Sequence, residues 1–206
     1  PTIIYSIYRD TNAKFVFFVT KKGLVKKTSL EEYINIKKKA GTIAINLKEG
    51  DGLASVCLVK DEDIILLTKY GMGIKINSLE IGATARATMG VKGMSFKEDD
   101  EIIAALPVRN KSDELAIFTS TGMGKKFSVN ELPVQKRAGK GLICHKLAST
   151  TGEVAGAALI SKEDSLLLCG DKNNICIAAT DIPSLGRASL GNQMLKNNNL
   201  LSVSKV

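Results

Sequence analysis

Residues 15–28 read FVFFVTKKGLVKKT, and this stretch decides the fold because its pattern recurs along the chain. The turn with its glycine recurs at Thr68–Gly71 and Thr119–Gly122, each time after an apolar run. A degenerate copy of the turn stands at Gly170–Asn173. The four anchors, spaced by 48, 51 and 51 residues, are Gly23, Gly71, Gly122 and Asn173. Asparagine tolerates the positive φ that glycine adopts, which favours a turn at the fourth anchor as well. The spacing predicts four structural repeats.

A second glycine follows each anchor after 18 or 19 residues: Gly41, Gly90, Gly141 and Gly191. Apolar runs flank each anchor, so the anchor is predicted to form a β-hairpin turn. The first strands of the units are expected at Phe15–Val19, Ile64–Leu67, Leu115–Phe118 and Leu166–Cys169. The alternation of Ile43, Ile45 and Leu47 predicts a third strand there. Fourth strands are expected at Leu53–Val59, Ile102–Val108, Val154–Ile160 and Leu200–Val203.

Four short strands per repeat are typical of a propeller blade, in which each small sheet buries its faces against its neighbours. Between the second and third strands, Ser29–Glu32 and Ser128–Glu131 form a capping-box pattern that predicts one helical turn. The fold class is therefore predicted to be all-β and propeller-like. A two-sheet sandwich is the alternative, but a sandwich does not require this internal period.

The repeats divide the chain into units at about 14–60, 61–111, 112–162 and 163–206. Residues 1–10 resemble the last strand of a preceding blade, with apolar residues over Ile3–Tyr8. The first residue is Pro1, and no secretory signal is visible. We therefore expect 1–206 to be one domain fragment of a longer chain, forming an incomplete or open array of about four blades.

Composition excludes several classes of protein. With 44% hydrophobic and 24% charged residues in 206, the chain is expected to fold rather than remain disordered. No apolar run approaches the roughly 20 residues of a membrane span. The four cysteines fit no zinc-site spacing and lie in apolar segments: Cys57, Cys144, Cys169 and Cys176. Buried thiols and a reducing, cytoplasmic location are therefore expected.

Positive charge recurs in phase with the repeat. The net charge is +8, but residues 21–48, 69–97, 122–147 and 171–196 carry +6, +4, +5 and +1, so the remainder carries −8. In a circular array, equivalent positions form a stripe, which suits a long, curved polyanion. Solvated surface charge is the plainer alternative for any single lysine. The candidate DNA-binding residues from this pattern are Lys26, Lys27, Lys37, Lys38, Lys39, Arg86, Lys92, Lys125, Lys126 and Arg187.

Residues 135–141 read QKRAGKG, which resembles the gyrase A box, Q-R-R-G-G-K-G, at five of seven positions. Lys136 keeps the charge of arginine without its bidentate fork, and Ala138 disfavours backbone conformations open to glycine. Residues 44–51 (AINLKEGD) and 90–94 (GVKGM) are similar to the same family. The whole chain resembles four units of the C-terminal DNA-binding domain of a bacterial type IIA topoisomerase A subunit, from either DNA gyrase or topoisomerase IV. The box adds Gln135, Lys136, Arg137, Gly139, Lys140 and Gly141 to the candidate site.

This resemblance implies a β-pinwheel, a propeller variant in which neighbouring blades exchange strands. It implies sequence-nonspecific binding of duplex DNA, which bends around a basic outer rim and is steered toward strand passage and supercoiling. The implied partners are the ATPase B subunit together with the breakage-reunion domain of the A subunit, in an A2B2 complex in the bacterial cytoplasm at the nucleoid. No cofactor is implied for this fragment, since ATP and Mg are used elsewhere in the parent enzyme.

The sequence offers little support for catalysis by this segment. His145 follows Cys144 in a predicted strand, so their side chains are expected on opposite faces, which disfavours a nucleophile–base pair. No phosphate-binding G-x-x-x-x-G-K-[ST] loop occurs. The other open interpretation is a propeller that binds an acidic protein or RNA, although WD and kelch signatures are absent.

Overall fold

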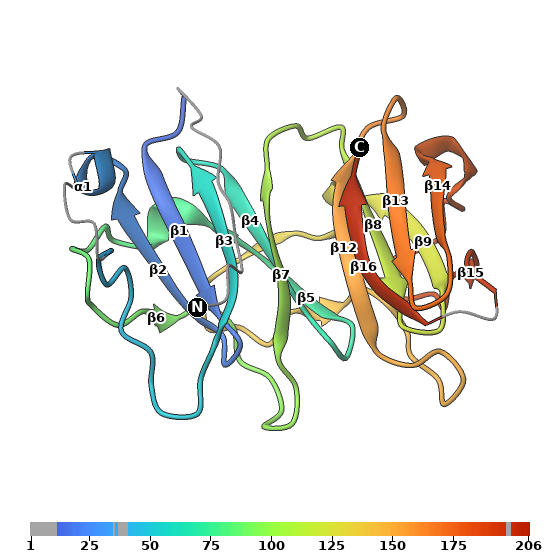
Figure 1. The fold of residues 1–206 in the computed structure, drawn as a ribbon, viewed down its shortest axis with the longest axis horizontal. Coiled ribbons are helices and arrows are strands. Elements are labelled where there is room, and N and C mark those ends of the chain that lie inside the picture. Colours follow the sequence, from blue (N-terminus) through green and yellow to red (C-terminus); the bar gives the residue numbers. More distant parts are fainter. Residues whose placement is uncertain (1–11, 35, 37–40, 197–198) are drawn as a thin grey trace.

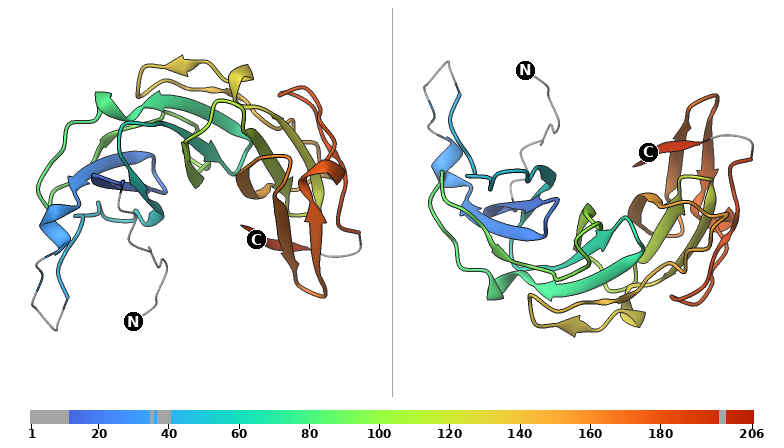
Figure 2. Two further views of the ribbon diagram at one scale, coloured as in Figure 1. Left: turned by 90° about the horizontal axis from the view of Figure 1, so that it is seen from above. Right: turned by 90° about the horizontal axis from the view of Figure 1, so that it is seen from below.

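A computed structural model describes residues 12–34, 36, 41–196 and 199–206, and the fold is all-β. Four small, mainly antiparallel sheets stand side by side (Figure 1) in an open arc (Figure 2), which confirms the predicted propeller-like class. The predicted strand at Ile3–Tyr8 and the cluster Lys37–Lys39 lie outside the described residues. Among the described residues, no helix has the length and apolar character needed to cross a membrane.

Each unit contributes a hairpin and a fourth strand at the predicted places. The hairpins pair β1 (Phe15–Thr20) with β2 (Leu24–Ser29), β4 (Asp63–Thr68) with β5 (Met72–Asn77), β8 (Glu114–Thr119) with β9 (Met123–Ser128), and β13 (Ser165–Gly170) with β14 (Asn174–Ala178). The fourth strands are β3 (Leu53–Val59), β7 (Ile102–Val108), β12 (Val154–Ile160) and β16 (Leu200–Lys205). One helical turn follows each second strand, as α1 (Glu31–Ile34), η1 (Ser78–Glu80), η2 (Val129–Glu131) and η3 (Ala179–Asp181).

Glycine anchors close three of the four hairpins. Gly23, Gly71 and Gly122 have φ of 80°, 78° and 83°, a region that side chains with a Cβ rarely adopt. In the first hairpin, the N–H of Gly23 donates to the carbonyl of Thr20 at 3.0 Å. The fourth hairpin also turns at its anchor, but Asn173 does not take a positive φ; the N–H of Gly170 donates to the Asn173 carbonyl instead. The expectation of a glycine-like φ at Asn173 is therefore wrong.

The third strand of each of the last three units belongs to the blade before it. The strands β6 (Val91–Lys92), β11 (Leu142–Ile143) and β15 (Asn192–Gln193) pair with β2, β5 and β9 of the preceding units. This confirms the strand exchange that the family resemblance implied. The strand predicted at 43–47 is wrong, because residues 41–48 form no strand. A third strand pairs only with a preceding blade, and the described residues contain none before β1.

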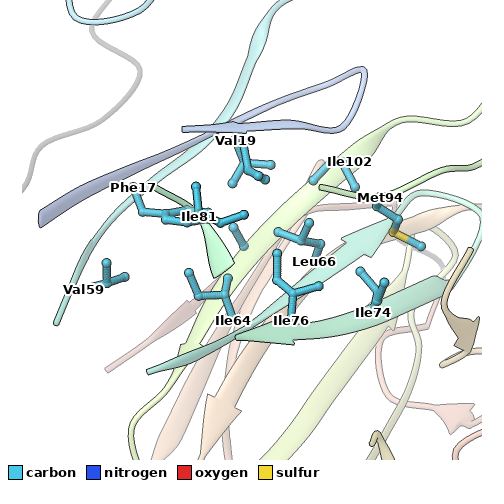
Figure 3. Packing of buried hydrophobic residues seen from close by; sticks show 12 residues of the cluster. Phe17, Val19, Val59, Ile64, Leu66, Ile74, Ile76, Ile81, Met94 and Ile102 are labelled. Atoms are coloured by element: carbon cyan, nitrogen blue, oxygen red, sulfur yellow. The ribbon is translucent and has the colours of Figure 1, made fainter. Parts of the chain in front are cut away.

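The hydrophobic core lies between the blades. Successive strand residues point to opposite faces, so the first strands of the two middle units, β4 and β8, each serve two interfaces. Ile64 and Leu66 of β4 pack toward the preceding blade, against Phe17 and other residues in Figure 3. Ile65 and Leu67 pack with residues of the following blade. Burial on both faces explains why the first strands are continuously apolar rather than alternating. Each fully buried Leu or Ile stabilises the stack by about 1.5–3 kcal/mol.

Main-chain hydrogen bonds tie each blade to the next at the hairpin turn. The carbonyls of Lys21, Lys69 and Ser120 accept N–H groups from the starts of the following fourth strands, at 2.9, 2.8 and 2.8 Å. The fourth strands line the concave side of the arc (Figure 2). The exchanged third strands and their loops lie along the convex side.

Candidate nucleic-acid interface

Each exchanged segment touches the preceding blade twice and bulges outward between the two contacts. In the third unit, β10 (Val134–Gln135) runs parallel to β5, with Val134 opposite Lys75. After the loop, β11 returns antiparallel on the same strand, with Leu142 opposite Gly73. Isolated parallel bridges place Ala83 and Ser184 in the equivalent positions of the neighbouring units. Residues 135–141, the box-like loop, are thus held at both ends.

We define the outer belt as residues 83–92, 134–143 and 184–193. These three segments follow one another along the convex side of the arc, coloured green, yellow and orange-red in Figure 2. A main-chain bond connects each segment to the residues after the preceding second glycine. The donor N–H and acceptor carbonyl pairs are Asn46 to Thr88 at 3.0 Å, Ser95 to Gly139 at 2.9 Å and Lys146 to Ser189 at 3.0 Å. The belt is therefore continuous across three blade junctions.

The outer belt carries six of the ten described cationic residues that the sequence singled out. Lys92, Lys136, Arg137 and Lys140 are exposed. The remaining predicted belt residues are half-buried: Arg86, Gln135, Gly139, Gly141 and Arg187. The structure brings the box residues together in one loop, and it places Arg86 and Arg187 in the corresponding loops of the adjacent units.

Three arginines occupy equivalent places in the belt, and each bonds a carbonyl of the preceding unit. The Nη1 of Arg86 donates to the Glu32 carbonyl at 2.9 Å, and that of Arg137 donates to the Lys92 carbonyl at 3.3 Å. The Nη1 of Arg187 donates to the Ile143 carbonyl. Since a guanidinium has five N–H donors, each arginine keeps several for a phosphate.

The backbone of the box-like loop is tightly constrained. Ala138 has a φ of 64°, so it adopts the left-handed conformation that glycine favours despite its side chain. Ala87, its equivalent in the second unit, does the same at 49°. At Gly141, with a φ of 71°, a Cβ would collide with the carbonyl of Gly73 on β5. The close approach of two backbones explains the glycine at this end of the loop.

Four lysines predicted to contact DNA lie in the interior instead. Lys26 and Lys125 are 2% and 0% exposed, and their ammonium groups bond main-chain carbonyls. Lys26 Nζ donates to the Ala44 carbonyl at 2.9 Å, and Lys125 Nζ donates to the Gly186 carbonyl at 2.9 Å. The prediction for these two residues is corrected, because a phosphate outside the molecule cannot reach a buried ammonium that already bonds carbonyls.

Lys27 and Lys126, their neighbours in sequence, are 4% and 7% exposed. Lys27 Nζ donates to the Ser78 carbonyl of the next unit at 2.8 Å, whereas Lys126 Nζ pairs with Glu114 at 2.8 Å. Lys75, at the same place in the second unit, donates to the Val129 carbonyl at 2.9 Å. These lysines therefore join strands and blades, and we remove them from the candidate interface.

Burial also disfavours the charged form of these lysines. It lowers the pKa of Lys125 to about 8 and lowers the pKa of Lys26, Lys27 and Lys75. One sequence signal could have revealed the burial. The residue in phase with Lys26 and Lys125 in the second unit is Ile74, which indicates a strand position that faces other protein atoms. In the fourth unit this position holds Cys176, which is exposed, so the expectation of buried thiols is wrong for this cysteine.

Two exposed cations of the same surface were missed by the sequence analysis. Lys146 and Lys196 each stand five residues after the second glycine of their units, and both are exposed. The N–H of Lys146 donates to the Ser189 carbonyl, which places this residue directly beside the belt. Their shared offset was visible in the sequence.

The acidic residues between the third and fourth strands serve the hairpin turns. Asp51 accepts the N–H of Lys22 at 3.0 Å, and Asp100 accepts the N–H of Tyr70 at 3.1 Å. Their carboxylates satisfy backbone groups that the turns leave without a strand partner. The acidic zone predicted away from the basic stripe therefore has a structural role at these two positions.

Cys144 and His145 do not form a reactive pair. Both side chains are buried, at 0% and 1% exposure, just beyond the end of β11 rather than within a strand. Burial raises the pKa of Cys144 to about 12 and lowers that of His145 to about 4. At neutral pH the thiol and the imidazole are both uncharged. Among the described residues, no group of three or more His, Cys, Asp or Glu is arranged to hold a metal ion.

Propeller-like blades that exchange their third strands define the β-pinwheel class of propeller domains. The family described as "DNA gyrase C-terminal domain, beta-propeller" matches residues 14–59, 62–109 and 113–161. The chain belongs to this family, which confirms the resemblance drawn from the sequence.

Curated relatives and solved structures agree with this assignment. The chain is 34% identical over 199 residues to the DNA gyrase A protein of Lawsonia intracellularis, covering 95% of the chain and 24% of that protein. It therefore spans about a quarter of the length of the relative. It also matches a solved C-terminal domain of DNA topoisomerase IV, with a TM-score of 0.88 and 28% identity over 96% of this chain and 62% of that one. A DNA gyrase A C-terminal domain matches with a TM-score of 0.83 and 29% identity, covering 95% and 66%.

Proposed function

We propose that this chain binds duplex DNA through its outer belt, without base specificity, and bends the duplex along the convex side of the arc. The observation that carries the proposal is the continuity of the belt. Exposed or half-exposed cations recur at each junction, on loops that are hydrogen-bonded in series. Lysine and arginine contacts of this kind neutralise phosphates and release counterions, which supplies affinity without reading sequence.

The curved arrangement favours bending over simple contact. Smooth bending of a short duplex by tens of degrees costs about 1–6 kcal/mol, so many small contacts must offset it. Three belt segments on successive blades offer contacts at regular intervals along such a path. Lys146, whose N–H donates to the Ser189 carbonyl of the belt, adds an exposed cation beside it.

The parent protein is proposed to be the A subunit of a bacterial type II topoisomerase, either DNA gyrase or topoisomerase IV. The names of the similar proteins support this assignment. In such an enzyme, the bent DNA would be presented for strand passage by the breakage-reunion domain of the A subunit, with the ATPase B subunit in an A2B2 complex. ATP and Mg would act in those parts, and this segment would contribute binding and geometry in the cytoplasm at the nucleoid.

The salt dependence of duplex binding tests the proposal. A plot of log affinity against log salt concentration should fall steeply, by roughly 0.9 for each phosphate contact. Replacing Lys136, Arg137 and Lys140 together by alanine should weaken binding and reduce that slope by about two to three. Fluorescence anisotropy with a labelled duplex measures both quantities, and the unfolding midpoint shows whether the variant remains folded.

The chain supplies a charge-matched control. Lys60, Lys111 and Lys162 are exposed and stand 51 residues apart in the turns after the fourth strands, outside the belt. Their combined replacement by alanine removes the same charge and should reduce affinity much less than the belt variant does. Equal losses for the two variants, or an affinity that is unchanged between about 50 and 200 mM salt, would contradict the proposal.

A further inference from the structure

Three glutamates stand at one repeated position beside the belt arginines. Glu32, Glu80 and Glu131 each lie nine residues after a glycine anchor. Each carboxylate accepts the backbone N–H of the arginine in the next unit. The pairs are Arg86 N–H to Glu32 Oε2 at 3.1 Å, Arg137 N–H to Glu80 Oε2 at 3.3 Å and Arg187 N–H to Glu131 Oε2 at 3.2 Å. The same contact thus occurs at all three blade junctions of the described chain.

These contacts replace the capping role that the sequence suggested for Glu32 and Glu131. In a capping box, the glutamate would reach back to the N-cap of its own helical turn. The Ser128 hydroxyl does accept the N–H of Asn130 at 3.2 Å, as a cap should. Glu131, however, reaches forward to the N–H of Arg187. The acidic half of the motif therefore connects two units.

A carboxylate is unexpected in a surface that attracts phosphates. Its charge alone would repel DNA, and the repetition at three junctions calls for a compensating role. The bulged belt loops leave the arginine N–H without a strand partner, and an ionised carboxylate is a strong acceptor for such a group. The next residue takes the left-handed conformation at Ala87 and Ala138. A fixed peptide just before that residue helps to hold the loop in this conformation.

The placement of the arginine side chains follows from the same backbone contacts. With the backbone held by Glu80, the Nη1 of Arg137 reaches the Lys92 carbonyl on the preceding segment. At the first junction, Glu32 contacts both the N–H of Arg86 and its Nε, at 3.1 and 3.7 Å. The glutamate thereby fixes the backbone position from which the arginine side chain extends along the belt.

We infer that Glu32, Glu80 and Glu131 are positioning residues, whose acceptor oxygen rather than charge holds the belt arginines in the geometry that bends DNA. This inference rests on the proposed function, because the positioned arginines are the proposed phosphate contacts. It also makes a prediction opposite to simple electrostatics. Removal of an acidic group from a DNA-binding surface should strengthen binding if charge alone matters, and should reduce bending if position matters.

The experiment compares Glu80→Gln with Glu80→Ala in the whole chain. Glutamine loses the charge but keeps an oxygen that can accept the N–H of Arg137, whereas alanine loses both. Amide hydrogen exchange without DNA should show Arg137 exchanging about tenfold faster or more in the alanine variant, and close to wild type in the glutamine variant. Energy transfer between the ends of a labelled duplex of about 30 base pairs reports the bend, and anisotropy reports affinity.

We expect Glu80→Gln to bend the duplex as wild type does, with equal or tighter binding. Glu80→Ala should bend it less and bind about threefold or more weakly than the glutamine variant, although both lack the same charge. Glu98→Ala and Glu98→Gln, at an exposed acid outside the belt, are the matched controls and should behave alike. Thermal unfolding of each variant reports whether it is folded.

Two outcomes distinguish failure of the proposed function from failure of the positioning inference. If the wild-type chain fails to bind duplex DNA, the proposed function is overturned, and the DNA role of the glutamates with it. If the wild type binds and bends DNA while Glu80→Ala and Glu80→Gln tighten binding equally, only the positioning inference is overturned.

Discussion

At the scale of the residue, lysine was the hardest side chain to interpret from sequence. Lys136 and Lys140 are exposed on the belt, whereas Lys26 and Lys125 are buried and bond carbonyls. A lysine has a long apolar stem and three N–H donors, so it can close a blade junction from inside or neutralise a phosphate from outside. Composition cannot separate these roles, because the difference depends on which strand face the residue occupies.

Ala138 gives a prediction at this scale. Its φ of 64° costs a residue with a Cβ about 1–2 kcal/mol, which the box glycine would avoid. Ala138→Gly should therefore raise the free energy of unfolding by about 0.5–1 kcal/mol, after the added flexibility of the unfolded chain is subtracted. Urea unfolding measures this change. The control is Ala148→Gly, at an exposed position without a positive φ, which should not be stabilised.

At the scale of the element, the hairpins and fourth strands were predictable and the third strands were not. The apolar runs around Gly23 and Gly71 are local signals, and β3 and β7 fall at the predicted residues. The third strands are two residues long and form only on a neighbouring blade. Residues 41–48 show the consequence, since their alternating pattern yields no strand and the described residues include no preceding blade with which it could pair. The strand exchange was predicted from the family resemblance and not from the periodicity of the sequence.

The anchor glycines connect hairpins to the exchanged segments, which gives a prediction for elements. The carbonyl of Gly122 accepts the N–H groups of Met194 and Leu195 at 2.8 and 3.2 Å. A Cβ at Gly122 would collide with the Leu195 carbonyl, and its φ of 83° is unfavourable for alanine. Gly122→Ala should lower the free energy of unfolding by about 2–4 kcal/mol.

Gly82→Ala is the matched control for this substitution. A Cβ at Gly82 meets nothing within 4 Å, and its φ is not positive. The change in its free energy of unfolding should stay within about 0.5 kcal/mol. If denaturant titration finds equal effects for the two variants, the anchor does not hold the blade junction as described.

At the scale of the whole molecule, the repeat and the charge period predicted much of the candidate site. The second-glycine loops of three units lie on one continuous surface, as a circular array requires. The basic stripe is nevertheless smaller than the charge count suggested, because Lys26, Lys27, Lys75, Lys125 and Lys126 are inside. The glutamate contacts between units could not be predicted, since they join residues more than 50 positions apart whose proximity depends on the blade angle.

DNA is proposed to bind along the convex side of the arc, and photo-crosslinking tests this placement most directly. A photoreactive residue at Val134, 48% exposed on the belt strand β10, is compared with one at Leu201, 65% exposed on the inner strand β16. Both are exposed apolar positions, so the comparison isolates the face of the molecule. With a labelled duplex at low salt, Val134 should crosslink efficiently and Leu201 should not. Crosslinking from Leu201 that equals or exceeds that from Val134 would contradict the account.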